Sequence, residues 1–477
     1  MDSIKHIFKK TKVICTIGPA SENVETLTKM AEAGMNICRL NFSHGSYEEH
    51  GKRIEMVRHV SDITGINLAV ALDTKGPEIR LGVFKNDEEN YQIGEEVTLV
   101  KEEIEGTHER FHIACPELFD DLKAGNYILI NDGKMKLTVL ENNGEEMKCS
   151  VDVAGPISSR KGCNVPGVKL SMPFLSEKDE ADIRFGCQND VDFIFASFVR
   201  RASDVNQIRK ILIDEGKPRI NIIAKIENQE GYDNIDSIIE AADGVMVARG
   251  DLGVEIPTMM VPVYQKHIIR HANRAGKPVI TATHMLDSMT HNPRCTRAEA
   301  ADVCNAVLDG SDGVMLSSET AAGDYPVEAC ETMSEIAEEA EKIIDYKTHL
   351  EWLKESSSRT VQDAVSIAIS DATLTLDISA IVIFTQGGTT ARRISKYRPN
   401  CPIIAITFSK DTQRKLEAYW GVLPVFSDVQ NNMTNDDDLA SLFARDYGIK
   451  RGTNIIISAG YPTGEGSANM MKIVEVK

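Results

Sequence analysis

Residues 220–251 read INIIAKIENQEGYDNIDSIIEAADGVMVARGD. The segment contains two short apolar runs, INIIAKIE and GVMVARGD, and each ends in charged residues. A stretch with helical spacing separates them. This order predicts a β-strand, a helix and a second β-strand, which is the unit that builds parallel sheets. The unit recurs through most of the chain, and its repetition indicates the fold.

Eight such strands are predicted. Ser46 with Glu49 and Thr296 with Glu299 form capping boxes that mark helix starts between strands, and Gly310 marks a helix end. Eight successive βα units predict an α/β fold, the closed (β/α)8 TIM barrel, whose reactive groups gather at the carboxyl ends of the strands. The predicted strands read, in order, TKVICTIG, MNICRLNFS, NLAVALDTK, VDFIFASF, INIIAKIE, GVMVARGD, PVITATHM and GVMLSSET.

The βα alternation is interrupted twice. Residues 76–171 have short strands with turn signals, so we expect a small inserted β-barrel domain there. This domain is either a lid over the active site or a passive decoration. The pattern of residues 347–477 predicts a second, smaller α/β domain. The catalytic barrel would then comprise residues 1–75 and 172–346.

Polar side chains crowd the carboxyl ends of seven predicted strands. RLNFSHG, residues 39–45, illustrates this pattern, because alternate residues of a strand share one face. Short polar residues that merely finish a strand would explain one or two such ends, but seven favour an active site. The residues concerned are Arg39, Asn41, Ser43, Asp73, Lys75, Ser197, Lys225, Glu227, Arg249, Asp251, Thr281, Thr283, Ser317 and Glu319.

Glu227 and Asp251, at the ends of neighbouring strands, are the best candidates for metal ligands. Two carboxylates with room for water and substrate oxygens suit Mg²⁺ or Mn²⁺. Lys225 shares a strand face with Glu227. It would stabilise an enolate or a transferring phosphoryl group beside the metal, or it forms only a structural ion pair. Gly250 would let backbone N–H groups approach a carboxylate or phosphate.

Other strand-end residues suit other ligands. Arg39 and Arg80 are cations suited to phosphate oxygens. Asn41, Ser43 and Asp73 present mostly neutral oxygens with one carboxylate. Such a set fits a weakly bound monovalent cation better than a second divalent site.

A glycine-rich segment in the third domain is a further candidate. TQGGTT, residues 385–390, follows a predicted strand and precedes a helix. It is either a phosphate cradle at a helix N-terminus or a plain turn, since it lacks the lysine of a P-loop.

Composition argues against several classes of function. The formal net charge of −19 argues against general nucleic-acid binding, but not against an anionic small substrate. No apolar run approaches the ~20 residues of a membrane span, and the first residues lack the apolar core of a signal peptide. The ten cysteines show no metal-binding spacing. We therefore expect a cytoplasmic protein with no membrane or nucleic-acid partner.

Five segments together resemble the signature segments of pyruvate kinases and occur in that family's order. The resemblance extends from Thr11 nearly to the end of the chain. It implies a glycolytic phosphotransferase that transfers the phosphoryl group of phosphoenolpyruvate to ADP, giving pyruvate and ATP. It also implies Mg²⁺ or Mn²⁺ and K⁺ as cofactors, and a homotetramer. The segments are RLNFSHG, LDTKGPEIR, KIEN, VARGDLGVEIP and TRAEAADVCNAVLDG.

The resemblance assigns roles around the substrate. The two candidate carboxylates would bind the divalent cation. Lys225 would stabilise the transferring phosphoryl group and the enolate, and Arg39 would hold the phosphate. The backbone at Gly250 and Asp251, with Thr283, would hold the substrate carboxylate. Thr283 would also lie near the face where the enolate is protonated.

The monovalent cation and the nucleotide are assigned in the same way. The resemblance implies that K⁺ binds to Asn41, Ser43, Asp73 and the carbonyl of Thr74. Glu78 is similar to the residue of members that require K⁺, whereas other members have a lysine there. The residues implied to contact the nucleotide are Asn41, His44, Arg80 and, from the lid, Lys161.

TQGGTT lies where related enzymes bind the phosphate of an activating sugar phosphate. GYPTGEGS, residues 460–467, resembles the loop that closes over it. Several bacterial relatives have a lysine where this chain has Thr389, so a sugar phosphate and a nucleotide both stay open as effector. The candidate effector residues are Thr385, Gln386, Gly387, Gly388, Thr389 and Thr390, and other departures from the family pattern are Cys163, Val165, His284, Cys295 and Ser318.

Two other functions stay open from the residues alone. A metal-dependent aldolase or decarboxylase acting through a pyruvate enolate would explain Glu227, Asp251 and Arg39, but not Lys161 of the lid. A non-enzymatic sugar-phosphate sensor would use only the C-terminal domain, and the intact Lys225 argues against it.

Overall fold

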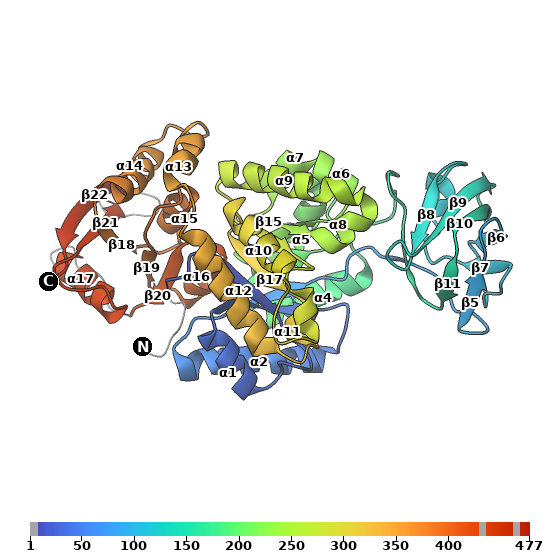
Figure 1. The fold of residues 1–477 in the computed structure, drawn as a ribbon, viewed down its shortest axis with the longest axis horizontal. Helices are drawn as coiled ribbons and strands as arrows, with labels where there is room; N and C mark the ends of the chain where they lie inside the picture. Colours follow the sequence, from blue (N-terminus) through green and yellow to red (C-terminus); the bar gives the residue numbers. More distant parts are fainter. Residues whose placement is uncertain (1–7, 429–435, 461–467) are drawn as a thin grey trace.

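The computed structural model describes residues 8–428, 436–460 and 468–477. Eight parallel strands close into a barrel, with β17 hydrogen-bonded back to β1 (Figure 1). Each strand lies within one of the eight predicted segments, so the predicted barrel is confirmed. The strands are β1 Lys12–Thr16, β2 Met35–Asn41, β3 Ala69–Asp73, β13 Phe193–Ala196, β14 Asn221–Ile226, β15 Gly244–Ala248, β16 Val279–Ala282 and β17 Gly313–Leu316.

Helices surround the barrel. Val70 and Leu72 of β3 pack with the helices, whereas Ala69 and Ala71 belong to the core inside the barrel. The capping box predicted at Ser46 is present, as is the one at the start of α10. The helices are α1 Val24–Glu32, α2 Tyr47–Thr64, α4 Glu177–Gln188, α5 Ala202–Asp214, α6 Gln229–Asp233, α7 Ile235–Ala241, α8 Arg249–Glu255, η1 Thr258–Met260, α9 Val261–Ala275, η2 Asp287–Thr290, α10 Arg297–Leu308, α11 Ser318–Ala321 and α12 Pro326–Glu341.

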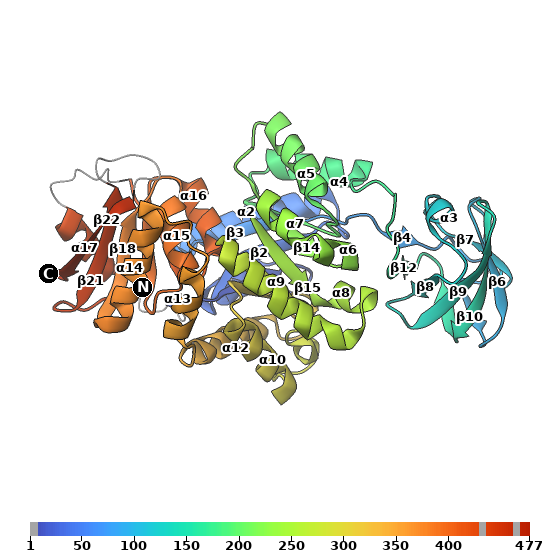
Figure 2. The same cartoon turned by 90° about the horizontal axis from the view of Figure 1, so that it is seen from above.

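The segment between β3 and α4 forms a separate β-rich body, at the far end of the molecule in Figures 1 and 2. Its main sheet runs in the order β4-β12-β8-β9-β10-β6-β7. An isolated bridge between Leu81 and Ile113 joins the two edges into a small barrel. The elements are β4 Ile79–Arg80, β5 Glu88–Tyr91, β6 Glu96–Val100, β7 Arg110–His112, α3 Leu118–Asp121, β8 Tyr127–Ile130, β9 Met135–Asn142, β10 Glu146–Val153, β11 Gly155–Ser158 and β12 Gly162–Asn164.

The C-terminal part is an α/β body with a five-stranded sheet in the order β20-β19-β18-β21-β22, in which only β22 is antiparallel to its neighbour. It packs against the amino ends of the barrel strands: Lys12 donates to the carbonyl of Val422 at 2.6 Å. Its elements are α13 Tyr346–Lys354, α14 Val361–Thr375, β18 Ile378–Phe384, α15 Thr389–Lys396, β19 Ile403–Thr407, α16 Lys410–Lys415, η3 Leu416–Ala418, β20 Val422–Phe426, α17 Asp436–Asp446, β21 Asn454–Gly460 and β22 Ala468–Glu475.

The two smaller bodies therefore lie at opposite ends of the barrel (Figures 1 and 2). The β-rich body lies at the carboxyl ends of the strands, where barrel enzymes place their chemistry. In the described ranges, no helix is long and apolar enough to cross a membrane.

Candidate active site

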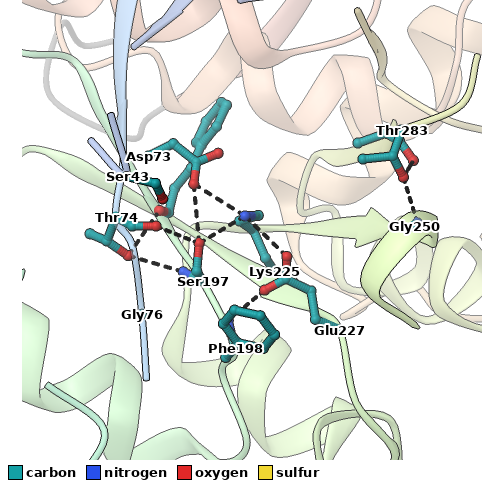
Figure 3. Close-up of polar contacts among 12 residues, drawn as sticks. Ser43, Asp73, Thr74, Gly76, Ser197, Phe198, Lys225, Glu227, Gly250 and Thr283 are labelled. Atoms are coloured by element: carbon teal, nitrogen blue, oxygen red, sulfur yellow. Dashed lines mark hydrogen bonds and ion pairs between the residues drawn. The ribbon is translucent and has the colours of Figure 1, made fainter. Parts of the chain in front are cut away.

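Four charged side chains are buried together at the carboxyl ends of β2, β3 and β14 (Figure 3 labels three of them). Arg39 is 9% exposed, Asp73 1%, Lys225 7% and Glu227 1%. Isolated charges are very costly to bury, so these groups must neutralise one another. We call these four residues the charge quartet.

Asp73 is the centre of the charge quartet. Its Oδ2 lies 2.5 Å from Nε of Arg39, and its Oδ1 lies 3.1 Å from Nζ of Lys225. Arg39 also donates to the hydroxyl of Thr16 at 3.0 Å. Burial alone raises the pKa of Asp73, but the charges of Arg39 and Lys225 outweigh this effect and lower it. Asp73 is therefore ionised and holds both cations.

Lys225 lies between two carboxylates. Its Nζ is 3.0 Å from Oε1 of Glu227 and 2.8 Å from the hydroxyl of Ser197, to which it donates (Figure 3). Burial lowers the pKa of Lys225, but Asp73 and Glu227 more than compensate, and the net shift is upward. The ammonium group thus stays charged at neutral pH and cannot act as a base.

The two carboxylate oxygens of Glu227 differ in their hydrogen bonds. Oε2 accepts a hydrogen bond of 2.5 Å from the backbone N–H of Phe198, whose φ of 55° aims that N–H at the site. Oε1 is buried, and among the residues that the structure describes it has no hydrogen-bond donor, only the ion pair with Lys225. Burial raises the pKa of Glu227 to about 7, although Lys225 opposes the shift. A buried carboxylate oxygen without a donor suits a metal ion.

Asp251 and Gly250 lie in the first turn of α8, directly after β15. Glu227 follows β14 and Asp251 lies just after β15, and these two strands pair side by side in the barrel. The charge of Asp251 also contributes to the raised pKa of Glu227. The N–H of Gly250 donates to the hydroxyl of Thr283 at 2.6 Å (Figure 3). Thr283 has a φ of 69° and is held by Arg249, which donates to its carbonyl at 2.8 Å. The predicted carboxylate-binding residues therefore form one unit.

The predicted potassium ligands lie beside the charge quartet. Asn41 faces Asp73 across β2 and β3. Its Oδ1 accepts from the N–H of Ser43 at 3.1 Å, which fixes the amide oxygen. The carbonyl oxygen of Thr74 lies 2.6 Å from the hydroxyl of Ser197. All four predicted residues thus come from one corner of the site.

Ser197 has a position in the site to which the sequence pattern assigned no role. Its hydroxyl oxygen is 3.1 Å from Oδ1 of Asp73, in addition to its contacts with Lys225 and Thr74. It therefore links the charge quartet to the predicted potassium ligands. Its position at the end of a barrel strand was the available signal, but a serine there has no preferred chemistry.

A cleft of about 360 Å³ separates the barrel from the β-rich body. Asp251 and Glu255 line it from the barrel, and Glu78 and Arg80 line it from the other side. Asn164 of β12 donates to Glu255 across the cleft at 2.8 Å. The predicted metal ligand Asp251 therefore faces the predicted lid.

The residues predicted to contact the nucleotide lie further apart than the predicted metal and substrate residues. Arg80 forms an ion pair of 2.8 Å with Glu78, which also pairs with Lys75 at 3.3 Å. His44 is exposed and Lys161 is half-buried, and neither lines the cleft. The structure thus brings only Arg80 of this set into the cleft wall.

The predicted divalent site has only two protein carboxylates. Within the described ranges, no three His, Cys, Asp or Glu side chains come together as a metal cage. Mg²⁺ rarely uses such a cage and prefers one or two carboxylates with water and substrate oxygens. Glu227 with its donor-free oxygen and the adjacent Asp251 fit this preference.

The candidate effector loop lies in the C-terminal body. Gly388, with a φ of 79°, precedes α15, and its N–H donates to the hydroxyl of Thr385 at 3.0 Å. The predicted closing loop falls on residues 461–467, which lie outside the described residues.

Comparison with known proteins gives two family matches. Residues 8–330 match the family described as pyruvate kinase, barrel domain, and residues 363–474 match pyruvate kinase, alpha/beta domain. The chain belongs to the pyruvate kinase family. The first match covers the barrel together with its inserted β-rich body, and the second covers most of the C-terminal body.

Comparison with individual proteins supports the same family assignment. Over 471 residues the chain is 50% identical to pyruvate kinases of Staphylococcus haemolyticus (strain JCSC1435) and Staphylococcus aureus (strain MRSA252). Each alignment covers 98% of this chain and 80% of the relative. The predicted function as a pyruvate kinase, a phosphotransferase, is thereby confirmed, and the predicted three-part fold agrees with it.

The contacts of Ser197 lead to the first prediction. In Ser197→Ala, Lys225 loses an acceptor and is less firmly oriented, so kcat should fall about tenfold or more. KM for phosphoenolpyruvate should change little, because Arg39 keeps its own contacts. Steady-state kinetics would measure both constants.

Ser203→Ala, an exposed serine of α5, is the matched control and should behave as the wild type. A Ser197→Ala variant with unchanged kcat would show that the hydroxyl does not position Lys225.

Proposed function

We propose that the chain transfers the phosphoryl group of phosphoenolpyruvate to ADP at the carboxyl end of its barrel, as the last step of glycolysis. The observation that carries this proposal is the charge quartet, in which Oε1 of Glu227 accepts no hydrogen bond among the described residues and pairs only with Lys225. In the reaction, an oxygen of the β-phosphate of ADP forms a bond to phosphorus. The bond from phosphorus to the enol oxygen breaks, and the resulting enolate takes up a proton to become pyruvate.

The charge balance of the site supports this reaction. Two cations and two carboxylates in the charge quartet cancel, whereas phosphoenolpyruvate and ADP both bring negative charge. Further cations are therefore needed before both anions can share the site. Glu227 and Asp251 would hold Mg²⁺ or Mn²⁺, which when bound supplies positive charge to the phosphoryl oxygens.

Each protein group then has a definite task. Lys225, charged because of its two carboxylate neighbours, stabilises negative charge on the phosphoryl group and on the enolate oxygen. Arg39 holds the phosphate. The backbone at Gly250 and Asp251 and the Thr283 hydroxyl would receive the substrate carboxylate, which would replace the hydrogen bond that the Gly250 N–H gives to Thr283. Thr283 would also lie on the path by which a proton reaches the enolate, through water.

Asn41, Ser43, Asp73 and the carbonyl of Thr74 are proposed to bind K⁺. Asn41 Oδ1 is pre-oriented by the Ser43 N–H, and carbonyl and carboxylate oxygens can accept more than one partner. Glu78 supports a requirement for K⁺. Family members with a lysine at this position have a positive charge there, and a glutamate supplies none.

The nucleotide is proposed to bind in the cleft, contacted by Asn41, His44, Arg80 and Lys161. Closure of the β-rich body over the cleft would bring Lys161 inward and exclude water that would otherwise accept the phosphoryl group. The Asn164–Glu255 hydrogen bond shows that the two bodies already touch at one point.

Several features are proposed from the family resemblance. Domain boundaries are placed at residues 1–75 with 172–346, at 76–171 and at 347–477. A homotetramer, a cytoplasmic location and allosteric control by a phosphate-bearing effector at residues 385–390 complete the proposal.

An assay of pyruvate formation tests the reaction. With phosphoenolpyruvate, ADP, Mg²⁺ and K⁺ the chain should form pyruvate only when ADP is present. Lys225→Met should lower kcat by three orders of magnitude or more, since it removes charge that acts on the transition state. Mn²⁺ and phosphoenolpyruvate should still bind.

Lys52→Met, an exposed lysine of α2, is the control and should keep full activity. Pyruvate formation that does not depend on ADP would favour the aldolase or decarboxylase alternative. A fall of less than tenfold in Lys225→Met would refute the role of this lysine.

Potassium dependence is a separate prediction. Replacing K⁺ with tetramethylammonium should abolish most activity, because this ion is too bulky for the proposed oxygens. Glu78→Lys should restore part of the activity without K⁺, since it supplies a positive charge nearby. Glu88→Lys, at an exposed position of β5, should not restore activity. Full wild-type activity without any monovalent cation would contradict the assignment of Asn41 and Ser43.

A further inference from the structure

Two histidines lie side by side on α9, one of the helices that surround the barrel. His267 and His271 are four residues apart, so they share one face of the helix. Their ring centroids lie 4.1 Å apart. α9 packs beside α7 (Figures 1 and 2). Two histidines at this spacing on a helix can bind one metal ion together.

Asp236, in the first turn of α7, contacts His271 from the neighbouring helix. Its carboxylate accepts a hydrogen bond from Nδ1 of His271. The Asp236 side chain is 80% exposed, so burial does not force this contact. A neutral ring that donates from Nδ1 has its free lone pair on Nε2. Histidines that bind metals commonly donate their other N–H to a carboxylate, and Asp236 is placed as such an outer partner.

His267 has a ring nitrogen that is left without a partner. Its Nδ1 is buried and forms no hydrogen bond within the described part of the chain. A buried polar nitrogen in this state is uncommon and indicates a ligand or a water. Burial and the neighbouring His271 lower the pKa of His267. The ring is therefore neutral at pH 7, and this is the form that binds metal ions.

The donor atoms select the kind of metal. Imidazole nitrogens suit Zn²⁺, Cu²⁺ and Ni²⁺, whereas Mg²⁺ prefers oxygen ligands. The net charge of −19 also favours the approach of a cation. Two histidines are fewer than the three side chains of a closed cage, which the described residues do not form anywhere. Water would therefore complete the coordination, and the ion would exchange with solvent.

We propose that His267 and His271 together bind one divalent transition-metal ion of the Zn²⁺ type, with Asp236 holding the ring of His271 in place. This bis-histidine site is separate from the carboxylate pair of Glu227 and Asp251. It uses nitrogen in place of oxygen donors, and it lies on the outer helices in place of the strand ends.

Side chains connect the bis-histidine site with the wall of the cleft. The ring of His267 lies 5.2 Å from that of Tyr232 on α6, and Tyr232 stacks on Tyr264 at 3.5 Å. The hydroxyl of Tyr264 donates to Gln229 at 3.1 Å, and Gln229 lines the cleft. An ion bound to α9 would therefore lie directly behind the cleft wall, although its binding does not rest on the proposed reaction.

Isothermal titration calorimetry of the full-length chain with Zn²⁺ tests the proposal, in excess Mg²⁺ to compete at Glu227 and Asp251. The first equivalent of Zn²⁺ should bind to the wild type and raise its melting temperature. His267→Ala and His271→Ala should each weaken binding at least about tenfold. Asp236→Asn should weaken binding less, because both imidazoles remain.

Two further variants make the test specific. His59→Ala removes an exposed histidine of α2 and should bind Zn²⁺ as the wild type does. His271→Gln keeps a polar side chain of similar size and should lose binding as His271→Ala does, so a folding defect in the alanine variant would not decide the outcome.

Three results would overturn the proposal. One is no binding of Zn²⁺ to the wild type in the presence of Mg²⁺. Another is wild-type affinity in the variants of His267 and His271, which would place any bound Zn²⁺ on thiols or carboxylates. The third is an equal loss of affinity in His59→Ala, which would indicate unspecific surface binding. Because calorimetry needs no turnover, these results are independent of whether the chain converts phosphoenolpyruvate to pyruvate.

Discussion

The active site depends on the buried carboxylate of Asp73, which holds two cations in place at once. Its oxygens lie 2.5 Å from Arg39 and 3.1 Å from Lys225. Removing one partner from such a buried group leaves an uncompensated charge and costs about 3–5 kcal/mol. Oε1 of Glu227 already pairs with Lys225 at 3.0 Å. Without Asp73, this one carboxylate would have to neutralise both cations and would be less able to bind a metal ion. The negative charge of Asp73 is therefore what allows Oε1 of Glu227 to accept a further partner.

The fold then explains where the charge quartet lies relative to the two smaller bodies. Barrel strands bring residues far apart in sequence to one end, where the cleft to the β-rich body provides space for a nucleotide. The amino end of the same strands meets the C-terminal body. β14 spans this distance, with Asn221 at its amino end and Lys225 near its carboxyl end.

Local pattern was sufficient for the barrel, because each strand is a short apolar run with a polar end. The local pattern is weaker in two strands of the C-terminal body. β20 contains Pro424 and lies at a sheet edge where proline is tolerated, and β22 is a half-exposed edge strand. For the site, charged and amide residues carried a chemical signal. Ser197 and the positive φ of Phe198 carried no such signal, since their roles arise only from contacts made by the folded chain.

The central claim is that the charge quartet leaves a carboxylate oxygen of Glu227 to bind a divalent cation together with Asp251. Titration with Mn²⁺, followed by electron paramagnetic resonance of the free ion, tests it most directly and requires no substrate. The account predicts one Mn²⁺ per wild-type chain and binding at least about tenfold weaker in Glu227→Gln. Glu180→Gln, on the exposed face of α4, should match the wild type. Equal Mn²⁺ affinity in Glu227→Gln and the wild type would contradict the account.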